Sequence, residues 1–241
     1  MHHILRNKIV LLSCLLWMVS GDLFSQTNQK GNYNFWEFRN KPFYFGLTVG
    51  LHSTGLIPAK SPEFVENTDI NFLSARNRPG LNLNIITNLK IGQYFDFRFI
   101  PGFAYSERRF LFSPPGSSVR NERSIESVFV EIPIHLRFKS APYKDKRIFV
   151  LGGIKYSYDV ASNSRVRREQ REDLLLISPN DFQFELGAGV QFFLPYFIFS
   201  PEIKFSRGIS NIHIFNGALD NSRIIDSLIS RGFSISFHFE G

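Results

Sequence analysis

The segment "QYFDFRFIPGFAY" at 93–105 places its Phe and Tyr side chains on one face of a strand and Asp96 and Arg98 on the other. This follows because successive side chains of a strand point to opposite sides. Eight segments of the 241 residues alternate in this way, which is typical of a single all-β domain. The segments are 43–52, 81–91, 93–105, 127–138, 147–160, 181–194, 196–206 and 232–240.

Long and short connections alternate between these segments. The long polar connections follow the first, third, fifth and seventh segments, and short ones such as "GQ" and "LP" follow the others. An even number of strands with short turns at one end and long loops at the other is the layout of a transmembrane barrel. We therefore predict an all-β, eight-stranded antiparallel outer-membrane β-barrel over 43–241, with short periplasmic turns and long extracellular loops.

The two faces of the strands differ in size as well as polarity. Glycines such as Gly46, Gly50, Gly153 and Gly187 lie on the polar face, whereas the opposite face carries most of the 27 Phe. The inside of a small barrel has less room than the outside, so the polar face should point inward and the Phe face toward lipid. The alternative is a soluble, lipocalin-like barrel with Phe inside and Lys, Glu and Thr outside.

The inward face carries charges of both signs. A lumen this narrow is filled with side chains and gives no pore for protein or sugar. A self-neutralising network of ion pairs is one interpretation, because buried charges need partners; a proton relay or a gate is the other. The predicted lumen charges are Lys90, Asp96, Arg98, Glu131, His135, Arg137, Lys155, Asp159, Glu185, Glu202, Lys204 and His238.

The chain begins with the pattern of an export signal, in which Arg6 and Lys8 precede the apolar run 9–19. We predict a signal peptide at 1–25, cleaved near Ser25, and a periplasmic N-terminal arm at 26–42. A lipoprotein site at Cys14 is the alternative. Cleavage near Ser25 removes the only cysteine, which excludes disulfides, a thiol nucleophile and Cys-based metal sites from the mature chain.

Neither enzyme chemistry nor nucleic-acid binding fits the pattern. Glu131 and His135 lie four residues apart on one strand face, about 13 Å, which is too far for a direct hydrogen bond. No GxSxG or HExxH motif occurs. The pI of about 9.6 comes from charges spread along alternating segments of an exported chain, so we expect no nucleic-acid partner, no cofactor and no metal.

Three stretches outside the alternating segments are candidate partner contacts. The loop 165–173 is either a solvated loop or a contact for lipopolysaccharide phosphates or an acidic partner. The stretch 220–230 is predicted to form one short helix, whose apolar face packs over the barrel mouth or contacts a partner. The arm 33–42 is aromatic and is expected at the inner membrane interface. The candidate contact residues are Arg165, Arg167, Arg168, Arg171, Ile224, Ile225, Leu228 and Trp36.

Three prolines conflict with a closed barrel, because a closed barrel has no free edge for a residue without an N–H group. Pro101, Pro133 and Pro201 lie inside predicted strands. We expect bulges, or positions near the rim, to accommodate them.

Several long segments resemble the PorT family of outer-membrane barrels of the Bacteroidetes. They include "RNKPFYFGLTVG", "FDFRFIPGFAYSER", "VLGGIKYSYDVASNS" and "FIFSPEIKFSRGISNIH". The resemblance implies a nonenzymatic component required for type IX secretion, and for motility in gliding members, with other secretion components as partners and no catalytic residues. A generic barrel for envelope stability or adhesion and a lipid-modifying enzyme are the alternative functions.

Overall fold

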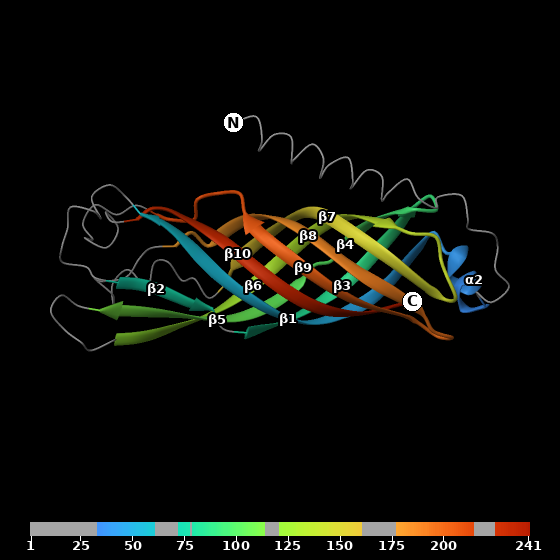
Figure 1. Cartoon of the computed structure of the whole chain (residues 1–241), viewed down its shortest axis with the longest axis horizontal. Helices are drawn as coiled ribbons and strands as arrows, with labels where there is room; N and C mark the ends of the chain where they lie inside the picture. The colour runs from blue at the N-terminus through green and yellow to red at the C-terminus, as the bar shows by residue number, and fades with distance from the viewer. Residues whose placement is uncertain (1–32, 61–71, 78, 114–120, 161–176, 215–224) are drawn as a thin grey trace, which may run out of the picture.

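The computed structural model describes residues 33–60, 72–77, 79–113, 121–160, 177–214 and 225–241 (Figure 1). None of these residues forms a helix long and apolar enough to cross a membrane. The elements are α2 (Tyr33–Arg39), β1 (Phe43–Lys60), β2 (Phe72–Asn77), β3 (Pro79–Ile91), β4 (Phe95–Phe99), β5 (Gly102–Ser113), β6 (Asn121–Lys139), β7 (Lys146–Asp159), β8 (Asn180–Phe193), β9 (Ile198–Gly208) and β10 (Ile225–Glu240).

The strands close into an antiparallel barrel. β1 pairs with both β10 and β3, so the first and last strands of the barrel join. The ten named strands occupy eight positions, because β2 and β3 both run along β5, and β4 and β5 both run along β6. The short turns, α2 and the C-terminus lie at one end of the barrel (Figure 1), which we call the short-turn end. The predicted eight-stranded all-β architecture is confirmed.

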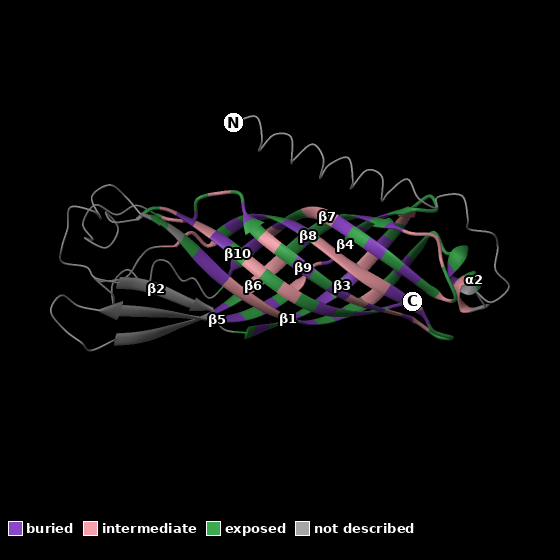
Figure 2. Ribbon diagram, viewed as in Figure 1, coloured by how far each residue is buried: buried purple, intermediate pink, exposed green. Residues whose placement is uncertain are grey.

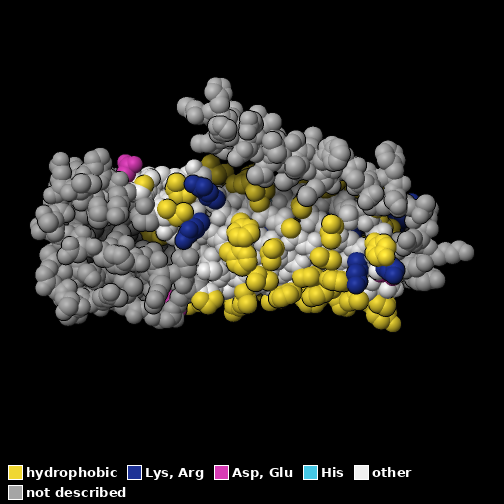
Figure 3. Space-filling view, in the orientation of Figure 1, with side chains coloured by type: hydrophobic (Ala, Val, Ile, Leu, Met, Phe, Trp, Pro, Cys, Tyr) yellow, Lys and Arg dark blue, Asp and Glu magenta, His cyan; other side chains and the backbone are white. Residues whose placement is uncertain are grey.

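The polar face of each strand points into the barrel and the Phe-rich face points outward, as predicted from the distribution of Gly and Phe. Buried and exposed residues alternate along the strands (Figure 2). On β1, Phe43, Phe45 and Leu47 are exposed, whereas Tyr44 and Thr48 are buried. Hydrophobic side chains therefore spread over the outside of the barrel wall (Figure 3). A soluble barrel would show the opposite arrangement.

Two inward glycines show why the interior needs small residues. A Cβ at Gly153 would lie 2.0 Å from the carbonyl oxygen of Ile134 and 2.8 Å from the ring of His135. A Cβ at Gly189 would lie 2.5 Å from the Phe149 ring, which covers this glycine from β7. Side chains already fill the space that any larger residue would need.

The prolines are accommodated without the predicted bulges. The pairing of β4 and β5 with β6 keeps one register through Pro101 and Pro133. Pro101 and Pro133 each accept one hydrogen bond between strands through the carbonyl. The Ile85 N–H donates to Pro101 at 2.9 Å, and the Ile100 N–H donates to Pro133 at 3.1 Å. Only the hydrogen bond that the missing proline N–H would donate is lost. Pro201 lies beside a gap in the β8–β9 pairing, opposite Phe237 of β10.

The predicted helix at 220–230 is wrong for the described part of that stretch. β10 begins at Ile225, and its residues 227–231 pair with 55–59 of β1. Cross-strand hydrogen bonding along β1 therefore overrides the helix-like spacing of Ile and Leu. Leu228 is 2% exposed, so it is not available as a surface contact. Ile224 lies outside the described residues.

We predict that Ile203→Arg destabilises the barrel. Ile203 is exposed on β9 opposite Ile235 of β10. It lies four residues after Phe199, which corresponds to about 10 Å along the barrel axis at about 2.5 Å per residue. This height is near the middle of a lipid-facing band about 25 Å tall. The loss should be about 2–4 kcal/mol in the free energy of unfolding from lipid vesicles. The control is Tyr196→Arg in the β8–β9 turn, where the side chain is 90% exposed and the loss should stay near 0–1 kcal/mol. Equal losses would contradict the assigned lipid face.

Candidate functional site

Ion pairs between strands fill the lumen, beginning near the short-turn end. The Asp96 carboxylate on β4 accepts hydrogen bonds from Arg137 Nη2 at 2.6 Å and from Lys139 Nζ, both on β6. Arg137 also donates to the Tyr44 hydroxyl and, at 3.1 Å, to Asn88 Oδ1. Its guanidinium lies 5.0 Å from the centroid of the Phe149 ring. Charge-assisted hydrogen bonds of this kind are the stronger class.

Arg98 continues the network across the lumen. Its guanidinium donates to Glu240 Oε1 at 2.8 Å and to Glu202 Oε2 at 3.0 Å. Glu240 also lies 3.5 Å from Arg137 Nη1. All of these side chains are fully buried. One guanidinium on β4 thus connects carboxylates on β9 and β10, which lie on another part of the barrel wall.

The network extends toward the long-loop end through Glu202 and Glu185. Glu202 lies 3.1 Å from His238 Nε2 and 3.8 Å from Lys204 Nζ. Glu185 lies 3.6 Å from Lys204 Nζ and 3.3 Å from Lys155 Nζ. The Glu185 carboxylate also contacts His135 Nε2 at 2.6 Å.

Lys155 makes the last described link, to Glu131 Oε1 at 2.9 Å. The Thr48 hydroxyl and His238 Nδ1 lie 2.6 Å apart, and this hydrogen bond joins Thr48 of β1 to the network. The distance between His238 and Glu202 is that of an ion pair, but this nitrogen makes no well-aligned hydrogen bond.

Formal charge balances along this chain of contacts. Among the described residues it joins five carboxylates to five Lys or Arg side chains, with two histidines that add charge only when protonated. The acids are Asp96, Glu131, Glu185, Glu202 and Glu240, and the bases are Arg98, Arg137, Lys139, Lys155 and Lys204. Each of these ten charges therefore has a partner of opposite sign, which is the condition for keeping it in a medium of low dielectric.

The structure brings most of the predicted lumen residues into this one network. Asp159 is buried at the far end of β7, beyond the pairs described above. His135 contacts Glu185 and not Glu131, in line with the spacing that argued against a Glu131–His135 pair. In the described part of the chain, no group of three or more His, Cys, Asp or Glu side chains is arranged to hold a metal ion.

Further inward residues, such as the buried Asp181 on β8, were not among the predicted set. Tyr44, Lys139, Arg147 and Glu240 are all buried in the barrel. The signal was present in the sequence, since Lys139 has the same phase as His135 and Arg137 on β6. Glu240 likewise has the phase of His238. Extending the alternation to the ends of the strands would have included them.

Helix α2 closes the lumen at the short-turn end (Figure 1). Phe38 is 4% exposed and packs in a cluster with Tyr44, Phe193 and Ile198, against which Phe35 also packs. The rings of Phe35 and Phe193 meet edge to face with centroids 5.0 Å apart. The arm therefore packs on the barrel mouth through Phe35 and Phe38 and does not place all its aromatic residues at the membrane interface.

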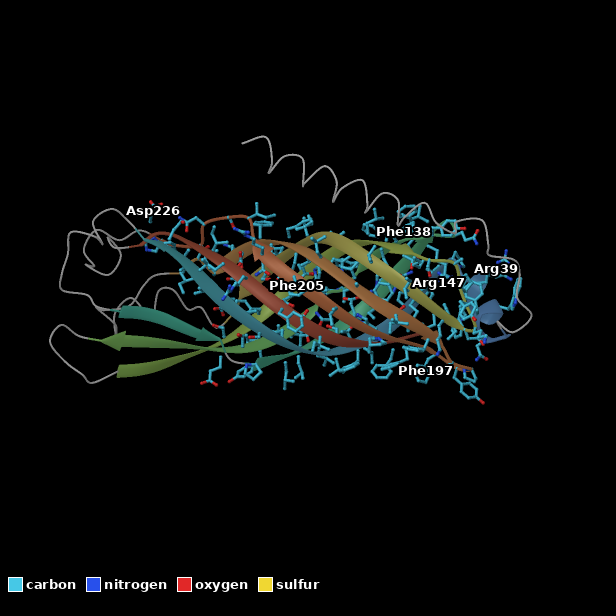
Figure 4. The ribbon with its side chains drawn as sticks, in the orientation of Figure 1. Arg39, Phe138, Arg147, Phe197, Phe205 and Asp226 are labelled. Atoms are coloured by element: carbon cyan, nitrogen blue, oxygen red, sulfur yellow. The ribbon has the colours of Figure 1, made fainter. Side chains whose placement is uncertain are left out.

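Polar contacts hold the helix in this position. The Phe35 N–H near the start of α2 donates to the Asp145 carboxylate at 3.0 Å, which satisfies an otherwise free helical amide. At the other end, Lys90 Nζ donates to the backbone carbonyl of Phe38. The Arg147 guanidinium lies 4.9 Å from the Phe35 ring and 5.5 Å from that of Phe193. Figure 4 shows Arg147 beside α2, with Arg39 at the end of the molecule.

The outer face of α2 carries Trp36, which is 50% exposed. The Arg39 guanidinium lies 4.6 Å from its ring centroid, a stacking contact that restrains both side chains. The other predicted contacts in the long loop, Arg165, Arg167, Arg168 and Arg171, lie outside the described residues. The side chain of Ile225 is not described either. Trp36 is therefore the predicted contact residue that the described part of the chain leaves on the surface.

Sequence comparison decides the family. The chain matches the family described as "Outer membrane protein beta-barrel domain" over residues 24–213. The chain belongs to this outer membrane β-barrel family. The Phe-covered wall of this outer membrane barrel thus faces lipid, and the protein resides in the outer membrane.

Solved structures with a similar fold are distant in sequence. Ail, the attachment invasion locus protein of Yersinia pestis, is 11% identical over 83% of this chain and 100% of its own, with a TM-score of 0.38. OprG of Pseudomonas aeruginosa is 12% identical over 82% and 96%, with a TM-score of 0.45. Neisserial surface protein A is 11% identical over 83% and 97%, with a TM-score of 0.40. No curated protein matches the chain.

We predict that Asp96→Asn destabilises the outer membrane barrel by about 3–5 kcal/mol, because it removes the carboxylate of the buried Lys139 and leaves Arg137 only the longer contact with Glu240. Urea unfolding from lipid vesicles measures the loss. Glu131→Gln at the other end of the network is the matched control, because Lys155 keeps Glu185 as a partner at 3.3 Å, so the loss should be clearly smaller than for Asp96→Asn. A neutral effect of Asp96→Asn would show that the network is not stabilised by charge pairing.

We also predict that the purified barrel gives no steady current in planar bilayers. The paired charges fill the lumen and α2 covers its short-turn end, so hydrated ions have no continuous path. Single-channel recording at both polarities measures this. Steady open steps like those of a porin would contradict the filled lumen.

Proposed function

We propose that this outer membrane barrel is a nonenzymatic component required for type IX protein secretion, and for gliding in gliding species. It would serve the export of cargo that carries C-terminal secretion signals. The proposal is supported by the resemblance to the PorT family, which runs through segments that now correspond to strands β1, β4 to β5, β7 and β9. The family match itself extends to the outer membrane barrel and no further.

The filled lumen is the observation that favours a scaffold or assembly role over a conduit. A polypeptide in transit would have to displace Arg98 from both Glu202 and Glu240 and remove Phe38 from the mouth. Exposing those buried charges without partners would cost several kcal/mol for each group. The barrel therefore contributes through the surfaces that it presents to other components.

The α2 face is the described surface best placed for such a partner. The short-turn end of an outer membrane barrel faces the periplasm, where other secretion components are accessible. Trp36 with its stacked Arg39 is the type of aromatic and arginine anchor that carries binding energy at interfaces. The loop with Arg165, Arg167, Arg168 and Arg171 stays a candidate contact for lipopolysaccharide or an acidic partner.

The test compares secretion in a clean deletion strain that carries either the wild-type gene or a variant. We expect the deletion to accumulate cargo in the periplasm, and Trp36→Ala to restore secretion only in part while heat-modifiable barrel stays in the outer membrane. Tyr196→Ala is the matched control, because Tyr196 is also a highly exposed aromatic residue at the short-turn end. It should restore secretion fully.

Two outcomes would oppose the proposal. Normal secretion in the deletion strain, together with a leaky or poorly adhesive envelope, would favour the generic stability or adhesion barrel. Full secretion by the Trp36 variant, with loss only in variants that alter the lumen charges but still fold, would move the function from the α2 face into the lumen.

A further inference from the structure

Two arginines face lipid side by side on the outer wall of the barrel. Arg207 on β9 and Arg231 on β10 are directly opposite in the antiparallel register, and both are exposed. Like charges directly opposite each other on neighbouring strands destabilise a sheet. Among the described residues, neither guanidinium makes an ion pair or a hydrogen bond that offsets this repulsion.

The pair stands at the end of a run of apolar outward positions on the wall. The outward positions of β9 and β10 below it are apolar in three successive pairs, Pro201 with Phe237, Ile203 with Ile235, and Phe205 with Phe233. Figure 4 labels Phe205 on this part of the wall. In the view of Figure 3, Lys and Arg side chains lie near the two ends of the hydrophobic region.

The height of the pair fits the boundary between acyl chains and headgroups. Arg231 lies eight residues before Phe239 (239 − 231 = 8) on β10. At roughly 2.5 Å of axial rise per tilted residue this is about 20 Å, close to the far edge of a band about 25 Å tall. Arginine side chains at such a depth extend toward the headgroups while their methylenes stay in the apolar layer. This end of the barrel carries the long loops and faces the cell exterior.

Neither register partner of the pair on the adjoining strands is charged. Opposite Arg231 on β1 stands Gly55, which has no side chain, and opposite Arg207 on β8 stands Phe184. Directly below the pair, the rings of Phe205 and Phe233 lie with centroids 5.1 Å apart. Both arginine side chains are exposed, so an anionic group can reach the two guanidiniums from the lipid side, with an apolar surface beneath it for attached hydrocarbon.

We propose that Arg207 and Arg231 bind a phosphate of an outer-leaflet glycolipid of the lipopolysaccharide type, whose acyl chains lie over Phe205 and Phe233. Two planar guanidiniums match the oxygens of one phosphate through charge-assisted hydrogen bonds. The phosphate removes the repulsion between the arginines. The apolar surface beneath selects a phosphate that carries acyl chains over inorganic phosphate. The site is independent of any role in secretion.

The test measures binding and melting temperature of the full chain in detergent micelles. The probes are lipopolysaccharide with phosphorylated lipid A, the same lipid after enzymatic dephosphorylation, and inorganic phosphate. We expect wild type to prefer the phosphorylated lipid, and the double variant Arg207→Gln, Arg231→Gln to bind it roughly tenfold more weakly, as expected for loss of charge-assisted contacts. Lys146→Gln, which removes an exposed cation at the start of β7, should bind like wild type.

Each further outcome bears on the proposal. Without lipid, the double variant should melt at the same temperature as wild type or higher, because the repulsion is gone; this also establishes that it folds. Equal binding of the phosphorylated lipid by wild type and the double variant would overturn the site. An equal rise in melting temperature with inorganic phosphate would overturn the assignment to a lipid.

Discussion

The contact of Arg98 with Glu202 and Glu240 is the interaction on which the interior depends. It joins β4 to β9 and β10, strands that lie far apart in the chain and are brought together only when the barrel closes. Before closure these charges would be unpaired in or near lipid, which is costly. Neutralising the lumen and closing the wall are therefore coupled, and the same coupling leaves no space for passage.

The outer wall, in contrast to the interior, must be apolar because it faces lipid. Apolar residues occupy the lipid-facing positions of β9 and β10 until Arg207 and Arg231. The interior can hold charge because each group finds a partner on another strand, whereas an outward charge can find one only in the membrane. The position of the two arginines near the edge of the band then has a physical reason, since phosphate groups lie at that depth.

The sequence was sufficient for the architecture because alternation and connection length are local signals. The inward phase of Asp96, Arg98, His135 and Arg137 could be read in the same way. The pairing of Arg98 with Glu202 and Glu240 could not, because it depends on register between strands that are remote in the chain. The helix expected at 220–230 failed because pairing with β1 outweighs the local spacing of Ile and Leu. The docking of α2 also depended on a tertiary contact, from Phe35 to Asp145.

The hydrogen bond from Phe35 to Asp145 links α2 to the strained turn between β6 and β7. Lys144 and Asp145 both have positive φ, 46° and 55°, a conformation that suits a tight hairpin but is costly for residues other than glycine. The Asp145 carboxylate accepts the Phe35 N–H, and the Asp145 carbonyl accepts the Phe193 N–H at 2.9 Å. The turn thus bonds α2 and the adjoining hairpin at once. Because α2 is fixed at both ends, Trp36 is presented in one orientation, and a partner that binds it loses little affinity to ordering the helix.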